Sequence, residues 1–370
     1  MKFLIVGHTP HFIKENKLFA YGPYVKEINL WITNVDEVEV LSPLSPKNPG
    51  TIHQQYSRDV HFTEIPAISL ISIKEILRAV FLTPKILYKI FKAMKRADHI
   101  HLRCPGNIGL LGCIVQLFFP NKIKTAKYAG NWDPNARQPL SYKLQKFILS
   151  NTKLTKNMQV LVYGDWPDQT VNVKSFFTAS YGEAKKKAVP MRKYDLPFRF
   201  LFVGNLSKGK RPLYAVKLIE GIINAGIPSE LHMYGDGILM NDVKTYIQEN
   251  NLGKTVYLYG NQKPEEVEEA YRKSHFLILP SKSEGWPKVV TEAMWWGVIP
   301  IVTRISCAPW ILAEGSRGIF IKCKQKKDIA HLVKELANKN ALRTKSNKAE
   351  IWSRKYSLEY FEREINKLIS

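Results

Sequence analysis

Short apolar segments of strand length alternate with longer segments of helical periodicity along most of the chain. The first half predicts strands at 3–6, 38–41, 60–65, 100–102, 124–128 and 159–162, and helices at 73–94 and 108–119. The second half predicts strands at 200–203, 231–234, 256–259, 276–279 and 298–302, and helices at 212–224, 239–249, 264–272 and 287–296. This alternation is typical of parallel sheets joined by crossover helices. We therefore expect an α/β protein.

A segment without periodicity, residues 181–197, interrupts this alternation. It contains two prolines and three consecutive lysines, which are typical of an exposed linker. A chain of 370 residues suits two domains. We expect domains arranged in this order: a Rossmann-like domain at 1–185, a linker at 186–198, a second Rossmann-like domain at 199–350, and a C-terminal helix at 351–370 that packs back on the first domain. A ligand would then bind in the cleft between the domains, at the carboxyl ends of the strands.

The charge of the chain is unusual, although its hydrophobic content of 45% is that of an ordinary globular protein. Lys and Arg number 55 against 32 Asp and Glu, which gives a formal net charge of +23 spread over both halves. An excess of this size favours an anionic partner: nucleic acid, an acidic membrane surface or a phosphate-bearing substrate. The charge does not choose among these three.

The cysteines and the apolar segments exclude several other classes of protein. The four cysteines form no CxxC pair, so we expect neither a zinc site nor a disulfide framework, and a reducing cytoplasm fits. No apolar run reaches the roughly 20 residues of a membrane span, and the first apolar run is too short for a signal peptide. We expect a cytoplasmic protein, held at most on the inner face of a membrane.

The most informative segment is 281–303, where a strand, a short loop and a helix follow one another. Glu284 precedes the helix, Gly285 permits close approach of a ligand to the backbone, and Pro287 occupies the first helical turn. Free amides and the helix dipole at this point attract an anion. Glu292 lies farther along the same helix. The simpler interpretation is a helix cap followed by a solvated glutamate.

The sequence of this segment, EGWPKVVTEAMWWGVIPIV, resembles the signature of family 4 retaining glycosyltransferases. That family has the GT-B fold, in which two Rossmann-like domains face each other across a cleft. The resemblance implies that Glu284 contacts the donor sugar and that Glu292 binds the ribose hydroxyls of a nucleoside-diphosphate sugar. It also implies that the backbone of the intervening residues contacts the sugar or the diphosphate, namely Gly285, Trp286, Pro287, Lys288 and Val289.

Two further segments of the second half resemble the same family. In 202–212, Lys210 falls on the lysine that neutralises the donor diphosphate, whereas Asn205 stands where the family has an arginine. Arg211 or another basic residue would then supply the missing charge, or the diphosphate is held by one cation fewer. A solvated basic turn is the alternative for this segment. The triplet Gly235-Asp236-Gly237 is common in the family, but it also marks ordinary tight turns.

The first half offers fewer candidates. Gly22 corresponds to the glycine loop that approaches the diphosphate in this family, or it begins an ordinary helix. His101, Arg103 and Asn107 end a predicted strand that faces the acceptor in the family, although a lone histidine there is more often structural. A histidine that many members carry after the next strand is absent, and Asn131 or Asp133 takes its place.

A basic amphipathic segment covers residues 74–96, and Pro84 is expected to divide it into two helices. Such a segment lies on an anionic membrane or packs against the core of the first domain. Both alternatives stay open on the sequence alone.

The resemblance implies a metal-independent hexosyltransferase with retained configuration, and no cofactor. Lys210 and the amides near Gly285 would stabilise the leaving diphosphate, while the acceptor is a carbohydrate or a lipid-linked glycan of cell-surface polysaccharide or glycolipid synthesis. The chain has no Asp-x-Asp triplet of the kind that holds a divalent cation in other glycosyltransferases. The alternatives are a non-catalytic basic binding protein on a degenerate GT-B fold, and an epimerase or phosphorylase of the same fold. No nucleic-acid partner is expected, because no recognition motif is present.

Overall fold

The computed structural model describes residues 1–189 and 192–369 in two compact units. The first unit comprises Met1–Phe177 and the chain from Phe361 onward, and the second comprises Thr178–Tyr360. The division thus falls at residue 177/178, ahead of the expected linker at 186–198. Two residues of that linker lie outside the described part of the chain.

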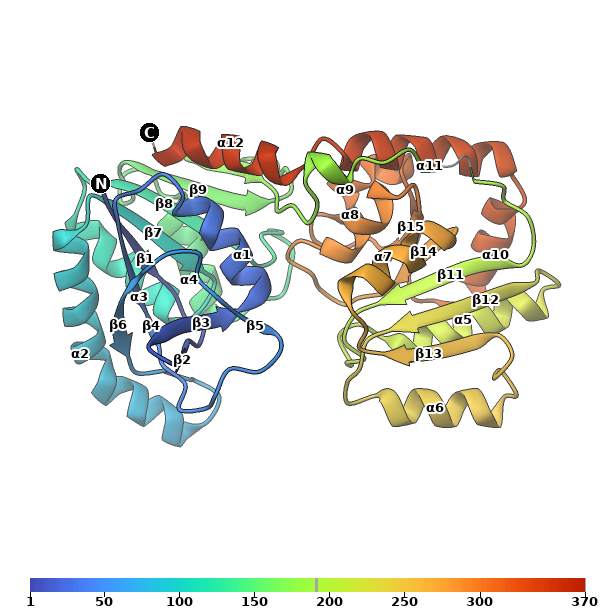
Figure 1. The fold of residues 1–370 in the computed structure, drawn as a ribbon, viewed down its shortest axis with the longest axis horizontal. Coiled ribbons are helices and arrows are strands. Elements are labelled where there is room, and N and C mark those ends of the chain that lie inside the picture. Colours follow the sequence, from blue (N-terminus) through green and yellow to red (C-terminus); the bar gives the residue numbers. More distant parts are fainter. Residues whose placement is uncertain (190–191, 370) are drawn as a thin grey trace. The chain divides into compact units, whose positions relative to one another are not determined.

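The first unit is built on a seven-stranded parallel sheet (Figure 1). Its strands, in spatial order, are β10 (Val173–Phe176), β9 (Met158–Tyr163), β8 (Ile123–Tyr128), β7 (His99–Cys104), β1 (Lys2–Val6), β4 (Glu37–Pro43) and β6 (His61–Ile65). A small antiparallel sheet joins β2 (Phe12–Lys14), β3 (Lys17–Tyr21) and β5 (His53–Gln55). All strands of the large sheet end at one edge, where ligand sites of such sheets lie.

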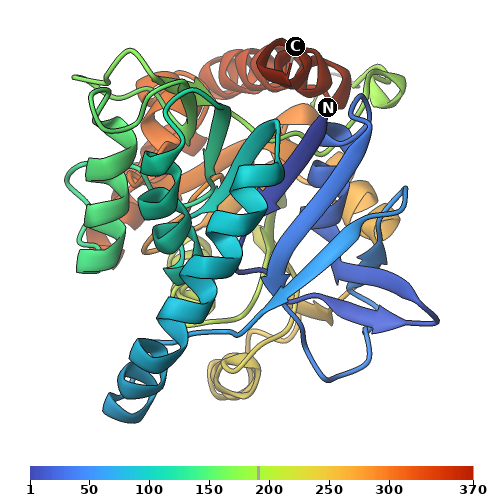
Figure 2. The ribbon, with the colours of Figure 1, turned by 90° about the vertical axis from the view of Figure 1, so that its left-hand side faces the viewer.

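Helices cover both faces of this sheet (Figure 2). One face carries α2 (Ile73–Arg96), α3 (Asn107–Val115) and α4 (Leu140–Ser150), which pack on alternate strand residues such as Leu4 and Leu102. The other face carries α1 (Gly22–Trp31) and the end of α12 (Leu358–Ile369). There Phe3 and Trp31 stack at 6.2 Å between ring centroids. The alternation of side chains along each strand therefore supplies two buried layers.

The second unit contains a six-stranded parallel sheet (Figure 1). Its order is β13 (Val256–Gly260), β12 (Ser229–Tyr234), β11 (Phe198–Val203), β14 (Phe276–Leu279), β15 (Ile299–Thr303) and β16 (Ile319–Ile321). The helices of this unit are α5 (Pro212–Asn224), α6 (Met240–Glu249), α7 (Pro264–Lys273), α8 (Lys288–Trp295), α9 (Ala308–Ile311), α10 (Gln325–Leu336) and α11 (Lys339–Ser353). The predicted α/β class is confirmed in both units.

Three details differ from the expectations. Pro84 does not divide α2, because Ile86, Ile90, Ala93 and Met94 bury the following turns against the sheet and hold one continuous helix. Helix α8 begins at Lys288, so Pro287 is its N-cap residue and not its first helical residue. The predicted helix at 108–119 ends at Val115 and continues as one 3₁₀ turn, Gln116–Phe118. Among the described residues, no helix combines the length and the apolar character needed to cross a membrane.

Candidate active site

Two loops of the second unit meet at the carboxyl edge of its sheet. One follows β11 and covers 204–211, and the other follows β14 and covers 280–287. Since β11 and β14 are parallel neighbours, their carboxyl ends lie side by side. The backbone amide of Lys282 donates to the carbonyl of Gly209 at 2.8 Å and ties the loops together.

The ion pair between Lys210 and Glu284 is the main feature of this edge. The Lys210 Nζ lies 2.5 Å from Glu284 Oε1, and the two side chains are 28% and 13% exposed. The Lys210 ammonium and the Glu284 carboxylate are therefore both within reach of a ligand. The structure thus brings together the two residues that the sequence predicted as catalytic.

The position of Glu284 is fixed by the loop that follows β15. The Ser306 hydroxyl donates to the carbonyl of Glu284 at 2.6 Å, and the Cys307 thiol donates to the carbonyl of Gly285 at 3.1 Å. Burial raises the pKa of Cys307 well above its usual range, so the thiol stays protonated and keeps this role as donor. Neither residue was predicted, because no local pattern shows that their loop touches 280–287.

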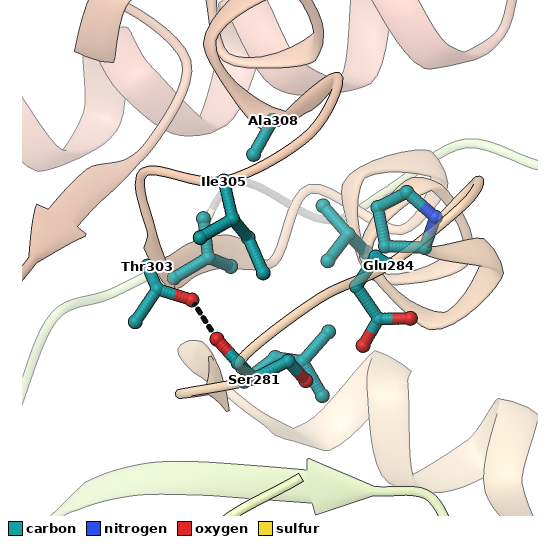
Figure 3. A pocket seen from close by; sticks show the side chains of 9 residues that line it. Ser281, Glu284, Thr303, Ile305 and Ala308 are labelled. Carbon is teal, nitrogen blue, oxygen red and sulfur yellow. Dashed lines mark hydrogen bonds between the residues drawn. The ribbon is translucent and has the colours of Figure 1, made fainter. Parts of the chain in front are cut away.

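A small cavity of about 10 Å³ lies beneath the Glu284 loop, which is room for about one water molecule. Figure 3 shows Glu284 beside it, with the Thr303 hydroxyl donating to the Ser281 carbonyl at 2.5 Å. The cavity is lined by Leu279, Ser281, Glu284, Pro287, Val290, Val302, Thr303, Ile305 and Ala308. A sugar does not fit there, so a ligand of Glu284 must lie on the outer side of the loop.

Glu292 has different neighbours from Glu284. Its Oε1 accepts from the Ser180 hydroxyl at 2.6 Å, and its Oε2 accepts from the Tyr271 hydroxyl at 3.1 Å. Burial and the charge of Glu292 raise the pKa of Tyr271 well above its usual range, so Tyr271 remains a donor. Each carboxylate oxygen still has a second acceptor position. No local sequence pattern points to Ser180 or Tyr271.

The guanidinium of Arg211 is already hydrogen-bonded within the protein. Its backbone is left-handed, with φ at 52°, and its guanidinium donates to the Pro280 carbonyl at 3.3 Å and to Cys323 Sγ at 3.0 Å. These bonds make it a brace of the 280–287 loop. Asn205 is exposed on the surface of its own loop.

The Gly235-Asp236-Gly237 turn packs directly on the loop that carries Lys210. A Cβ atom at Gly235 would lie 2.0 Å from the carbonyl oxygen of Gly204, and the φ of Gly235 is +129°. Only glycine allows this close approach. The triplet therefore shapes the neighbouring loop, a role that the sequence could not separate from an ordinary turn.

The remaining residues of the signature either pack their side chains in the core or contribute through their backbone. The Trp286 side chain is 7% exposed and packs among Trp310, Trp352 and Tyr356, so only its backbone can face a ligand. The amide of Lys288 donates to the Trp286 carbonyl at 2.9 Å and is already engaged. Val289 follows it in the first turn of α8.

In the first unit, two candidates have structural roles. His101 is fully buried beside Trp31, at 4.3 Å between ring centroids, and its Nδ1 lies 2.8 Å from the Thr125 hydroxyl. Burial and the charge of Arg103 lower the pKa of His101 well below its usual range, so its ring is neutral. The structure thus places His101 among the buried side chains of the first unit, and its acceptor-side role stays a prediction. The Gly22 amide donates to the Ile52 carbonyl at 2.9 Å, so it is not available to a diphosphate.

Arg103 ends β7 at the carboxyl edge of the first sheet, but it is already paired. Its NH1 lies 2.5 Å from Glu27 Oε1, the two side chains are 10% and 7% exposed, and the guanidinium lies over the Tyr24 ring. At the same edge, His11 Nε2 lies 2.7 Å from the Tyr56 hydroxyl. The sequence did not predict that these aromatic and charged side chains gather there.

The other candidates of the first unit fold their own loops. Asn107 donates from Nδ2 to the Ile68 carbonyl at 3.2 Å. Asn131 Oδ1 accepts from the amide of Asp133 at 2.9 Å, and Asp133 Oδ1 accepts from the amide of Asn135 at 2.8 Å. Such bonds are typical of Asx turns. In the described part of the chain, no three His, Cys, Asp or Glu side chains gather in a way that could hold a metal ion.

Comparison with known proteins adds a family to this geometry. Residues 184–351, which carry Lys210, Glu284 and Glu292, match the family model described as "Glycosyl transferases group 1". This segment is a group 1 glycosyltransferase domain. A curated relative from Escherichia coli, UDP-Gal:alpha-D-GlcNAc-diphosphoundecaprenol alpha-1,3-galactosyltransferase, is 34% identical over 156 residues, 41% of this chain and 39% of the relative. The chain covers about a third of the length of each curated relative that it matches.

Solved structures resemble the chain over its whole length. The lipopolysaccharide outer core galactosyltransferase WaaB, in its apo form, matches with a TM-score of 0.72 and 15% identity over 100% of this chain and 99% of its own. The HepE protein of Anabaena in complex with UDP matches with a TM-score of 0.66 and 12% identity over 100% of this chain and 99% of its own. These likenesses show the fold, and the predicted two-Rossmann architecture of GT-B type is confirmed.

The group 1 glycosyltransferase domain therefore presents a cation and a carboxylate on adjacent loops at one sheet edge. An ammonium group can stabilise negative charge on a phosphate, and a carboxylate can accept from sugar hydroxyls. Because both belong to loops braced by Ser306, Cys307 and Arg211, their positions are set before a ligand arrives.

Proposed function

We propose that the protein is a retaining, metal-independent hexosyltransferase of cell-surface polysaccharide or glycolipid synthesis. The donor is a UDP-hexose, with UDP-galactose first, and the acceptor is a hydroxyl of a lipid-linked glycan. The observation that carries this proposal is the Lys210–Glu284 pair at the carboxyl edge of a group 1 glycosyltransferase domain. The printed activity of the curated relative supports the choice of donor and acceptor. The protein would work on the inner face of the membrane that holds this acceptor.

Donor binding would divide the Lys210–Glu284 pair between two parts of the substrate. The Lys210 ammonium would bind the diphosphate, and the Glu284 carboxylate would accept from hydroxyls of the sugar. Each group gains a charged hydrogen bond in exchange for the one that it gives up. The pair is also a restraint, since it holds both side chains in place before the donor binds.

The reaction is a front-face displacement on the anomeric carbon. The acceptor oxygen forms a bond to that carbon while the bond to the diphosphate oxygen breaks, and the acceptor proton passes to the leaving diphosphate. Negative charge grows on the diphosphate as the bond breaks, and Lys210 stabilises it most at that point. Glu284 orients the sugar and forms no covalent bond. The products are the glycoside and UDP.

Glu292 would bind the ribose through the acceptor positions that Ser180 and Tyr271 leave open. Both residues donate to the carboxylate, so they fix its direction. Replacing the carboxylate removes the charged hydrogen bonds to the ribose. We therefore expect Glu292→Ala to weaken UDP binding by about 10- to 100-fold.

The test is thermal unfolding of the full chain with UDP, GDP, ADP and CDP, with EDTA present throughout. A nucleotide at 100 times its Kd should stabilise the native state by about 2.7 kcal/mol. We expect UDP alone to give this shift and Glu292→Ala to lose most of it. Transfer of galactose to a lipid-linked acceptor, followed by release of UDP, then tests the reaction.

Other outcomes would contradict the proposal. A shift with another nucleotide would overturn the choice of donor, and a requirement for a divalent cation would overturn metal independence. No shift with any nucleotide, together with salt-sensitive binding of nucleic acid, would favour a non-catalytic basic protein.

A further inference from the structure

Helix α2 has two apolar faces, of which only one is buried. Ile86, Ile90, Ala93 and Met94 pack in the core of the first unit. A second apolar row is exposed to solvent on the other side of the helix: Ile73, Leu77, Val80, Phe81, Tyr88 and Phe91. An ordinary surface helix has one apolar stripe and a polar opposite face. The exposed apolar row of α2 is therefore a candidate surface for binding a partner outside the fold.

The exposed apolar residues are largest and densest at the N-terminal end of α2. Ile71, Ile73 and Phe81 are 92%, 79% and 83% exposed, and Ala79 is the one buried residue of Ile73–Leu82 in this described helix. This half of the helix runs past the sheet in Figure 2. It is held mainly by the continuity of α2 with the buried turns after Pro84.

Basic side chains flank this apolar row. Lys74, Arg78, Lys85 and Lys92 recur at helical spacing beside it and are all exposed. Residues 71–96 contain seven basic residues and one acidic residue, Glu75. The Glu75 carboxylate accepts from the Ser69 hydroxyl at 2.8 Å near the start of the helix. The exposed face of α2 is therefore apolar and cationic.

The second unit lacks a comparable surface. Of the large apolar residues that are exposed in the described chain, all but Leu196, Ile238, Tyr259 and Ile351 belong to the first unit. Phe118, whose ring contacts Phe91 of α2, is one of them, and α4 carries two others, Leu140 and Phe147. The exposed apolar residues are thus concentrated in the first unit, and α2 carries more of them than any other element.

We propose that Ile71, Ile73, Leu77 and Phe81, with Lys74, Arg78 and Lys85, form a docking face that inserts into an anionic lipid bilayer. The apolar side chains would enter the boundary between headgroups and acyl chains, and the cations would bind the lipid phosphates. The excess of cations over acidic groups complements a negative surface. A protein groove would require acidic partners for the same cations, and a second copy of this docking face would repel it.

The docking face lies beside the carboxyl edge of its own sheet, which holds the predicted acceptor-side residues. Helix α2 follows β6, so its N-terminal end is at the carboxyl edge, and Asn107 Nδ2 donates to the Ile68 carbonyl there. Insertion of the face would bring this edge to the membrane surface. If the proposed function holds, a lipid-linked acceptor reaches that edge without leaving the bilayer.

The experiment measures co-sedimentation of the full chain with two kinds of vesicle. One kind contains phosphatidylglycerol and phosphatidylcholine, and the other contains phosphatidylcholine alone. We expect binding to the anionic vesicles, and Lys74→Gln, Arg78→Gln and Lys85→Gln together should weaken it about 100-fold, since each cation near the surface contributes about fivefold. Ile73→Asp, Leu77→Asp and Phe81→Asp together should abolish it.

Matched variants of the second unit distinguish the effect of the docking face on vesicle binding from the effect of the net charge. Lys244→Gln, Lys254→Gln and Lys263→Gln remove the same charge from exposed positions, and Ile238→Asp and Ile351→Asp alter exposed apolar ones. These controls should change vesicle binding by less than the corresponding changes on α2. Equal losses would show adsorption by net charge alone and would overturn the proposal.

One added tryptophan reports insertion by comparison with the parent chain, which already has eight tryptophans. Phe81→Trp keeps an aromatic side chain at the most exposed aromatic position of α2. The fluorescence that it adds to that of the parent chain should shift to the blue on vesicle binding and be quenched by brominated lipids. No shift or quenching would overturn insertion. Insertion would also be overturned if the chain failed to bind vesicles and instead self-associated, and if the aspartate variant abolished that self-association. UDP binding and transfer to a water-soluble acceptor should survive in the aspartate variant, so failure of docking and failure of the proposed function are distinguishable.

Discussion

Two ion pairs of the same length, one in each unit, have different surroundings. Arg103 and Glu27 of the first unit lie 2.5 Å apart and are 10% and 7% exposed. Lys210 and Glu284 of the second unit lie at the same distance and are 28% and 13% exposed. Each pair lies at the carboxyl edge of a parallel sheet. Their difference in burial separates a structural pair from one that can exchange its partner for a ligand.

The cause of this difference is the element that supplies each carboxylate. Glu27 belongs to α1, which packs on the sheet, and the Arg103 guanidinium lies over the Tyr24 ring of the same helix. Glu284 belongs to a loop, and only its backbone is held by Ser306. A pair enclosed between a helix and a sheet cannot open without unfolding part of the unit, whereas a pair between two loops can.

Breaking the enclosed pair should give the largest effect. Arg103→Ala removes the cation that pairs with the buried Glu27 carboxylate, which we expect to lower the free energy of unfolding by about 3–5 kcal/mol. Chemical denaturation followed by hydrogen exchange of each unit measures this loss. Arg103→Met together with Glu27→Leu, which removes both charges, should recover most of it. An unchanged stability with lost transfer activity would instead make Arg103 a substrate-binding residue.

Breaking the open pair should change activity and leave stability nearly intact. Lys210→Ala removes the cation that stabilises the leaving diphosphate, and we expect kcat/KM for transfer to fall about 10²- to 10³-fold. Lys208→Ala, an exposed lysine of the same loop, is the matched control and should retain activity. Equal losses in the two variants would show a general effect of charge and not a specific role for Lys210.

The smallest difference between the units should appear on acidification. Burial lowers the pKa of His11 and His99 in the first unit to about 4, and burial lowers that of His275 in the second unit to about 4. Below pH 6.5 the unfolded chain takes up protons that the native histidines do not. Stability is therefore complete above pH 6.5 and declines as the pH falls toward 4, by about 2 kcal/mol for each such histidine at pH 5.

Because His101 is buried beside His99, the first unit should lose more stability than the second between pH 7 and pH 5. Hydrogen exchange at the two pH values, corrected for intrinsic rates, reports each unit separately. His99→Gln does not titrate and should remove its share of the dependence. The comparison fails if both units lose the same stability, or if His99→Gln leaves the dependence unchanged.

The fold and the donor-side loops could be predicted because their signals are local. Strand and helix periodicity follows from which side chains are buried along each element, and it located nearly every element of the second unit. The segment that contains Glu284 and Glu292 is continuous in the sequence, so its pattern could be recognised without the fold. Small elements such as β16 and the β2–β3–β5 sheet were missed, since strands of three to five residues carry too little periodicity.

The sequence by itself determined the α/β architecture, the identity of the glutamates and lysine of the second unit, and the basic amphipathic character of α2. Tertiary structure alone decided that Lys210 pairs with Glu284, that Ser180 and Tyr271 hold Glu292, and that His101 is a core residue. It also decided which apolar row of α2 is buried, because only the packed sheet distinguishes the two rows. The physical reason is range: periodicity and loop chemistry act over a few residues, whereas these contacts join positions far apart in the chain.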